Sequence, residues 1–162
     1  MKLRPLEQRD APLMLEWMHD PDVVYHLSAN FAEKTLEDCQ RFIAWAAQAR
    51  GDLHLAVADD ADTYMGTVSL KHIQDGSAEF AITVRACAMG KGYAGYGMDA
   101  ILKKGLQELG LGAIYWCVSQ RNNRAVRFYD KNGYTRTEEI PAAIRNAYTA
   151  QQNADFIWYV YR

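Results

Sequence analysis

The stretch Met89-Gly90-Lys91-Gly92-Tyr93-Ala94-Gly95-Tyr96-Gly97 lies between a segment with strand periodicity and a segment with helical periodicity. At the start of a helix, main-chain N–H groups are unpaired and lie at the positive end of the helix dipole. Glycines let a phosphate approach these groups closely, and Lys91 adds a positive charge. The stretch therefore predicts an anion-binding loop, although glycine-rich turns also precede helices for structural reasons alone.

The segments after this loop predict a parallel crossover. A helix with a buried apolar face is expected to end at Gly110, and residues 113–118 are apolar on both faces, as in a central strand. Strand, loop, helix and strand in this order imply a right-handed connection between parallel strands. A helix over 123–131 and strands over 134–138 and 156–161 are expected to follow. Residues 139–154 form a long connection without assigned structure that is long enough to cover a site.

The segments before the loop predict an antiparallel meander. Apolar residues alternate over 53–57, 66–70 and 80–84, and Asp75-Gly76 suits the tight type I′ turn of a hairpin. Further upstream, Asp10 is expected to cap a first helix. Thr35 and Asp38 resemble the capping box of a second helix, which we expect to end at Gly51.

The composition indicates one folded domain. With 162 residues, of which 49% are hydrophobic, the chain fits a single domain over residues 1–162. A formal net charge of −2 excludes a global basic field, so no nucleic-acid partner is expected. No run approaches about 20 apolar residues, and no signal-peptide pattern follows Met1. We therefore expect no membrane partner and a cytoplasmic protein.

Few other side chains suggest chemistry. The cysteines in apolar segments are expected to be reduced core thiols, with a single catalytic cysteine as the alternative: Cys39, Cys87 and Cys117. No metal is expected, because no histidine is in a ligand or triad arrangement. His26 is a candidate for lining an acceptor pocket, whereas His54 and His72 are expected at outward strand positions. The tryptophans are expected in the core: Trp17, Trp45, Trp116 and Trp158.

A second motif follows the predicted parallel strand: Asn122-x-x-Ala125-x-x-x-Tyr129-x-x-x-Gly133-Tyr134. Together with the glycine loop, it resembles the GCN5-related N-acetyltransferase (GNAT) family. In that family, a loop written Gln/Arg-x-x-Gly-x-Gly/Ala holds the pyrophosphate of coenzyme A. Gly92 and Ala94 match its last two fixed positions. Met89 stands where Gln or Arg is expected, which removes one potential charged contact.

The resemblance covers nearly the whole chain and implies an α/β fold. The fold is a mixed central sheet of about six to seven strands with an antiparallel N-terminal meander, one splayed parallel strand pair and about four helices. The third meander strand is expected to end in a bulge that splays it from the parallel strand. Leu3-Arg4-Pro5-Leu6 and Trp17-x-x-Asp20-Pro21-x-Val23 also look like the subgroup of ribosomal-protein N-terminal, spermidine and amino-sugar acetyltransferases.

The resemblance also implies an activity: acetyl transfer from acetyl-CoA to a primary amine by direct attack in a ternary complex. Tyr129 matches the family tyrosine that protonates the departing thiolate. The residues that the resemblance assigns to coenzyme binding lie on the third meander strand, in the glycine loop and after the parallel strand: Ile82, Thr83, Val84, Met89, Gly90, Lys91, Gly92, Tyr93, Ala94 and Asn122.

The amine needs a base, and Glu79 is the candidate. It alternates with Phe80, Ile82 and Val84, so its side chain is expected to point toward the splayed gap. The alternative is a solvated strand carboxylate. The acceptor is a small-molecule amine or a protein N-terminal amine.

Three points stay open. A module that binds coenzyme A or a nucleotide without catalysis, and acts through a partner protein, is the alternative function. A longer acyl chain or an O-acyl acceptor is a further possibility. A homodimer is plausible, since aromatic strand residues such as Trp158 and Tyr161 could pair with a second copy.

Overall fold

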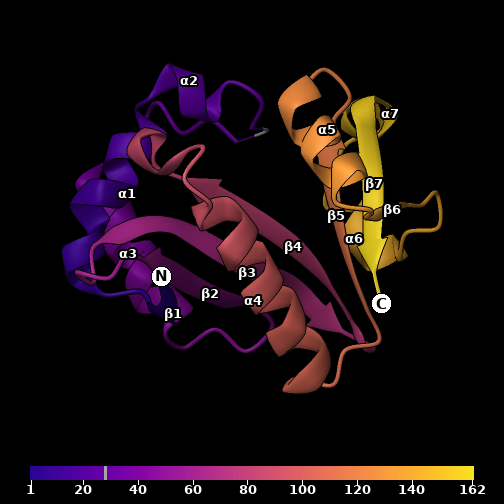
Figure 1. Ribbon diagram of the computed structural model, residues 1–162, viewed down its shortest axis with the longest axis horizontal. Helices are drawn as coiled ribbons and strands as arrows, with labels where there is room; N and C mark the ends of the chain where they lie inside the picture. The colour runs from indigo at the N-terminus through magenta and orange to yellow at the C-terminus, as the bar shows by residue number, and fades with distance from the viewer. Residues whose placement is uncertain (28) are drawn as a thin grey trace.

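The computed structural model describes residues 1–27 and 29–162, which form one seven-stranded mixed sheet (Figure 1). The strands lie in the order β1-β2-β3-β4-β5-β7-β6, and only β4 and β5 pair in parallel within this described part. The strands are β1 (Lys2–Pro5), β2 (Leu53–Ala58), β3 (Tyr64–Gln74), β4 (Ser77–Val84), β5 (Ala113–Ser119), β6 (Thr135–Arg136) and β7 (Phe156–Tyr161). The predicted α/β fold with an antiparallel N-terminal meander is confirmed.

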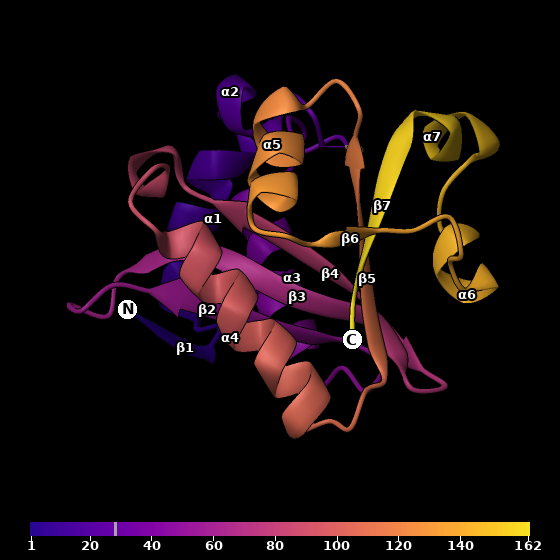
Figure 2. The ribbon, with the colours of Figure 1, turned by 45° about the vertical axis from the view of Figure 1, so that its right-hand side comes forward.

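Helices cover both faces of the sheet (Figure 2). In the described residues, four helices have eight or more residues and three are shorter: α1 (Ala11–Met18), α2 (Pro21–Val24), α3 (Leu36–Ala46), α4 (Tyr93–Gln107), α5 (Asn123–Lys131), α6 (Ala142–Arg145) and α7 (Ala150–Asp155). α4 and α5 pack on one face, where Ile101 joins the core around Val68 and Trp116. α1 and α3 pack on the other face at β2 and β3, and α6 covers that same face at β5 and β7. No described helix has the length and apolar character needed to span a membrane.

Local sequence signals are confirmed where they depend on neighbouring residues. Asp75 and Gly76 have φ angles of 51° and 76°, as a type I′ hairpin turn requires. Thr35 and Asp38 form the predicted capping box of α3. That helix ends at Ala46, before Gly51, so the predicted end was wrong.

Asp10 does not cap α1 with its side chain. Its carboxylate instead accepts hydrogen bonds from Arg4, at 2.7 and 2.8 Å, and from the main-chain N–H of Glu7. Both charged side chains are buried, and a buried carboxylate binds a guanidinium more strongly than it binds one helical N–H. Asp10 therefore holds β1 against the start of α1.

The splay between β4 and β5 forms the central feature of the sheet. The two strands pair over only three residue pairs, the last of which is Glu79 with Tyr115. Beyond Glu79 the strands diverge, and the V between them is visible in Figure 1. The predicted bulge at the end of β4 was wrong, because β4 stays in unbroken register with β3 from Glu79 to Val84. The gap therefore arises from the short β4–β5 ladder.

The C-terminal strand lies inside the sheet. β7 pairs with β5 along its whole length and with β6 over two residue pairs. Trp158, Tyr159 and Val160 are buried. The strand is therefore not an exposed edge, which removes the basis for the predicted pairing with a second copy.

Several burial predictions were wrong for one shared reason. His54 is only 8% exposed, because α3 covers its side of β2, whereas Trp45 on α3 is 50% exposed. Cys87 is also exposed. Periodicity shows which residues share a face, but it does not show how far a neighbouring element extends over that face.

Candidate functional site

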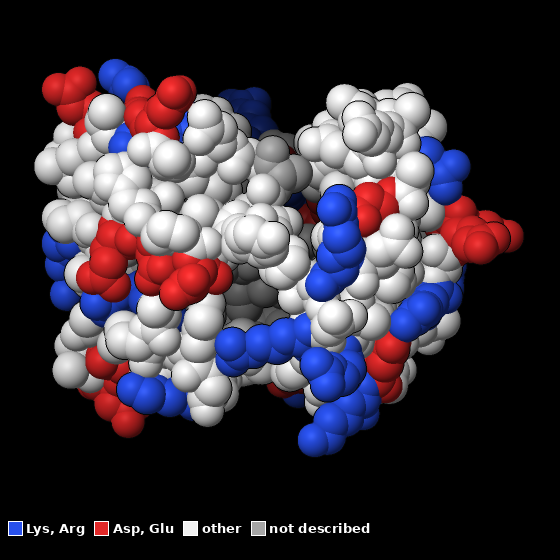
Figure 3. Space-filling model, turned by 90° about the horizontal axis from the view of Figure 1, so that it is seen from above, with Lys and Arg blue, Asp and Glu red and all other residues white. Residues whose placement is uncertain are grey.

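A cavity of about 430 Å³ lies where β4 and β5 diverge. Seen from above, the molecule is hollowed between its two halves, with Lys and Arg side chains along one side of the hollow (Figure 3). The lining comes from α2 and the segment after it, from β3, β4 and β5, from the glycine loop and the start of α4, from α5, and from the connection before β7 and the start of β7. Predicted site residues that line it are Glu79, Ile82, Thr83, Val84, Met89, Ala94, Asn122 and Tyr129.

One edge of β4 is available to a ligand in this cavity. The N–H of Arg85 donates to the carbonyl of Met65 on β3 at 2.8 Å. Because main-chain groups alternate in direction along an antiparallel ladder, Thr83 faces β3 as well. The N–H groups of Ile82 and Val84 therefore point to the opposite edge, into the gap. Of the three predicted strand residues, Ile82 and Val84 can bind a ligand through the main chain and Thr83 cannot.

The glycine loop begins α4 in a left-handed turn. Gly90 and Gly92 have φ angles of 73° and 88°, and Gly92 is the N-cap of α4. A side chain at either position would strain this backbone. The first main-chain N–H groups of α4, from Tyr93 onward, have no acceptor within the helix. The loop thus has the geometry of an anion site, although only Met89 and Ala94 of the loop border the cavity itself.

Two polar side chains lie at the start of α5. Asn122 caps the helix, since its Oδ1 accepts from the N–H of Ala125 at 3.2 Å. Its Nδ2 group remains available to a ligand. Arg124 Nη1 lies 3.9 Å from the sulfur of Met89. The guanidinium therefore supplies a positive charge where Met89 does not, a role that the sequence motif did not indicate.

Tyr129 lies at the junction of the cavity and the core. Its ring packs against Trp116 and Tyr159, with ring centroids 5.5 and 5.0 Å away. Burial raises the pKa of its phenol above the ordinary value. Tyr129 therefore stays protonated at neutral pH and can donate a proton into the cavity.

Glu79 lies at the other end of the cavity and is only 2% exposed. The hydroxyl of Tyr148 donates a hydrogen bond to Glu79 Oε1. Lys71 Nζ lies 3.6 Å from the same oxygen, and His72 Nε2 lies 3.6 Å from Glu79 Oε2. Oε2 is buried and has no hydrogen-bond partner in the described structure. The alternative of a solvated strand carboxylate was therefore wrong.

The other predicted side chains differ in what they can contribute to the cavity. His26 lines the cavity, as expected for an acceptor pocket. Cys117 also lines it, but burial raises the pKa of its thiol to about 12, so the nucleophilic thiolate is scarce at neutral pH. This argues against a catalytic cysteine. In residues 1–27 and 29–162, no three His, Cys, Asp or Glu side chains are grouped as metal ligands.

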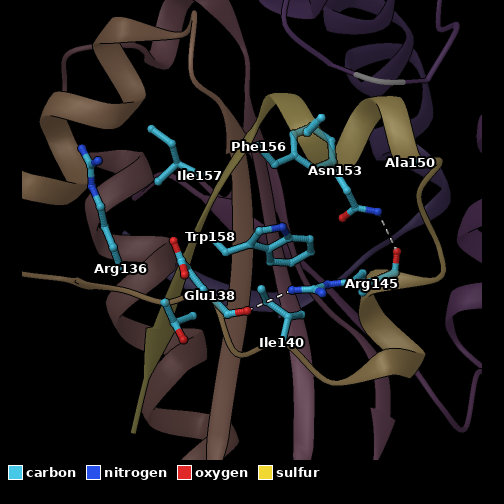
Figure 4. Close-up of a pocket in the computed structure, with 11 residues that line it drawn as sticks. Arg136, Glu138, Ile140, Arg145, Ala150, Asn153, Phe156, Ile157 and Trp158 are labelled. Carbon is cyan, nitrogen blue, oxygen red and sulfur yellow. Dashed lines mark hydrogen bonds between the residues drawn. The ribbon is translucent and has the colours of Figure 1, made fainter.

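A second cavity, of about 650 Å³, lies between β7 and the α6–α7 segment (Figure 4). The indole of Trp158 lies at its centre, and Arg145 donates to the carbonyl of Glu138 at 2.9 Å. Phe156 borders both cavities. Among its described lining residues there is a carboxylate, Glu138, but no tyrosine, so the second cavity lacks the combination of groups that meets in the first.

Comparisons with known proteins agree with this geometry. A protein-family model described as an acetyltransferase (GNAT) domain matches residues 1–135. The fold is similar to a spermidine N-acetyltransferase from Vibrio cholerae in complex with CoA and spermine, with a TM-score of 0.80 and 20% identity, covering 99% of this chain and 94% of that chain. It is also similar to an acetyltransferase of the GNAT family from Bacillus anthracis, with a TM-score of 0.75 and 21% identity, covering 98% of this chain and 91% of that chain. A search of curated proteins finds no match.

Proposed function

Because the chain belongs to the GNAT acetyltransferase family and is an N-acetyltransferase that uses acetyl-CoA, we propose that the cavity between β4 and β5 is its active site. The observation that carries this proposal is the convergence of three groups on one cavity: the free edge of β4, a buried tyrosine and a buried carboxylate. The lining extends from Val23 to Phe156, which supports residues 1–162 acting as one catalytic domain.

The donor end of the cavity fits coenzyme A. Acetyl-CoA supplies the acetyl group as a thioester. The free N–H groups of Ile82 and Val84 can pair with the amide-bearing arm of the coenzyme, as a neighbouring strand would. The start of α4 at Gly92 can hold the pyrophosphate, because its N–H groups and helix dipole favour an anion. Asn122 and Arg124 complete the donor end from α5.

The mechanism that these residues support is direct attack of the amine. Glu79 takes a proton from the acceptor ammonium, directly or through water, and leaves a free amine. The amine nitrogen forms a bond to the thioester carbonyl carbon, and the carbon–sulfur bond breaks. Tyr129 donates its proton to the departing sulfur. The nitrogen loses its second proton as the amide forms, and this proton returns to the Tyr129 oxygen through water, so the products are an amide, a thiol and a protonated Tyr129. No bond to the protein forms at any point.

We infer that the acceptor is a small-molecule primary amine rather than a protein N-terminus. The relative from Vibrio cholerae was solved with spermine, a small amine. Here the cavity is lined by apolar and aromatic side chains that include Leu27, Phe31, Tyr148 and Phe156. A cavity of about 430 Å³ with such a lining fits a small molecule better than a folded partner.

A thiol-release assay with acetyl-CoA and a panel of primary amines tests the proposal. Turnover that depends on the amine is expected, and mass spectrometry should find one added acetyl group on the product. A parallel titration measures acetyl-CoA binding by calorimetry. Tight binding without turnover of any amine would favour a silent coenzyme-binding module that acts through a partner. Propionyl-CoA and alcohol acceptors in the same assay test the longer-acyl and O-acyl alternatives.

A further inference from the structure

The charge at the acceptor end of the cavity is unusual for a site that would bind a polyamine. Among the described lining residues, only Lys71 and Glu79 carry a formal charge, and they have opposite signs. They face each other across β3 and β4, with 3.6 Å between Lys71 Nζ and Glu79 Oε1. The lining therefore has no net charge with which to attract a polycation.

Both members of this ion pair have unused hydrogen-bonding capacity. Glu79 Oε2 is buried and has no hydrogen-bond partner among the described residues, which is costly for a carboxylate oxygen. The 3.6 Å separation from Lys71 is too long for a hydrogen bond, and the described residues offer Lys71 Nζ no closer partner. An ammonium group has three donors to satisfy. His72 Nε2 lies 3.6 Å from Oε2, which is also too long for a hydrogen bond. Glu79 Oε2 can therefore accept a hydrogen bond from a further cation, and the partly exposed Lys71 Nζ can donate one to an anion.

We propose that the acceptor is an amino acid, that is, a primary amine with a carboxylate close to it. This inference rests on the proposed function, since it assumes that Glu79 receives the reacting amine. The acceptor ammonium would fill Glu79 Oε2, and the acceptor carboxylate would bind Lys71 Nζ. A zwitterion replaces one loose ion pair with two close ones, without leaving a buried charge unpaired.

The surroundings of the pair indicate the rest of the acceptor. Leu27, Phe31 and Phe156 line the same cavity and present apolar surface. An apolar amino-acid side chain would bury that surface. A polyamine with several positive charges would need several carboxylates, and Glu79 is the only one in the described lining.

Matched pairs of acceptors that differ only in the carboxylate test this inference. Phenylalanine is compared with phenethylamine, and leucine with 3-methylbutylamine, by thiol release from acetyl-CoA. Phenylalaninamide and spermidine complete the panel. We expect kcat/KM to be about 10-fold or more higher for each amino acid than for its simple amine, the usual contribution of a charge-assisted hydrogen bond.

Variants of Lys71 test whether this side chain causes the preference for amino acids over simple amines. In Lys71→Met, the ratio of kcat/KM between amino acid and simple amine should fall toward one, mainly through a higher KM for the amino acid. Lys71→Arg should retain most of the ratio. Lys103→Met, on the exposed surface of α4, should leave both the ratio and the rates unchanged.

Two outcomes separate the inference from the proposed function. If no amine of either kind is acetylated, the proposed function is wrong. If simple amines, phenylalaninamide or spermidine match or exceed the amino acids as substrates of the unaltered protein, only the amino-acid inference is wrong. This comparison does not depend on whether the Lys71 variants fold.

Discussion

The two ends of the proposed active-site cavity are built from different kinds of groups. At the proposed donor end, they are main-chain N–H groups of β4 and of the start of α4, positioned by Gly90 and Gly92. At the proposed acceptor end, they are side chains: Lys71, Glu79 and Tyr148, which come from separate segments of the chain. A main-chain site can keep its geometry when a side chain changes, as with methionine at position 89 in place of Gln or Arg, because that geometry depends on φ angles. A side-chain site changes its ligand when one charge changes.

The largest effect is expected from Tyr129, where the two ends meet. Tyr129→Phe retains the packing against Trp116 and removes only the hydroxyl, so the fold should survive. We expect kcat to fall by about 100-fold or more, the usual contribution of a positioned proton donor, with little change in acetyl-CoA affinity. Because burial raises the pKa of Tyr129, loss of its proton should not limit kcat near neutral pH. Rapid-quench kinetics measure the chemical step.

Tyr134→Phe is the matched control. Tyr134 packs against the same tryptophan, with ring centroids 5.1 Å apart, but it does not line the cavity. Its variant should retain the parental chemical rate. Equal rates for Tyr129→Phe and the unaltered protein would make Tyr129 a packing residue.

The next effect is expected at Glu79. Glu79→Gln retains the size of the side chain and an oxygen that can accept from Tyr148, but it removes the basicity. The rate should fall by about 100-fold where the acceptor is mostly protonated, and recover partly as the pH rises and free amine becomes available. A pH profile of kcat/KM measures this, with Glu108→Gln on the surface as the control. A uniform loss at every pH would indicate that Glu79 binds the acceptor without taking its proton.

A smaller effect, confined to the donor end, is expected at Gly92. Gly92→Val places a β-branched residue at a φ angle of 88° and distorts the start of α4. The Kd for acetyl-CoA in a calorimetric titration should rise by about 10-fold, as expected when one or two hydrogen bonds to an anion are lost. Gly110→Val is the control, because Gly110 follows the other end of α4 and has a similar φ of 67°. Equal losses of affinity in the two variants would remove the loop from the binding site.

The smallest effect is expected at Arg124. Arg124→Gln should raise the Kd for acetyl-CoA by about three-fold at low ionic strength, and the difference should shrink as salt screens the exposed charge. Arg127→Gln is the control on the same helix, since Arg127 has no contact with Met89 among the described hydrogen bonds. If the two variants bind equally at low salt, Arg124 does not replace the charge that Met89 lacks.

The local geometry of the proposed donor end could be predicted from the sequence. At the proposed acceptor end Glu79 and His26 were predicted, but Lys71 and Tyr148, the partners of Glu79, were not, for the same physical reason. The hairpin at Asp75-Gly76, the start of α3 and the turn at Gly92 depend on residues that are neighbours in the chain. The contact between Tyr148 and Glu79 joins residues 69 positions apart. It depends on where α6 and α7 lie over β5 and β7, and these short helices fall in a segment without a strong periodic signal.

The sheet shows the same difference between features that depend on neighbouring residues and features that join distant segments. Each strand of the meander follows the previous one, so its neighbours could be predicted. The insertion of β7 between β5 and β6 places strands side by side that are distant in the chain. The length of the β4–β5 ladder also depends on packing from both faces, and the gap arises from this short ladder rather than from the expected bulge.

The open edge of β4 has a consequence for self-association. A strand edge without a partner is usually a template on which another chain can add a strand and begin to aggregate. Here the free groups of Ile82 and Val84 lie inside the cavity, with Leu27 and Asn122 among the residues that line it. A thin linear molecule can reach this edge, whereas a strand that carries side chains on both faces would collide with the walls. The protein thus keeps an unpaired strand for its ligand without exposing it to other copies of itself.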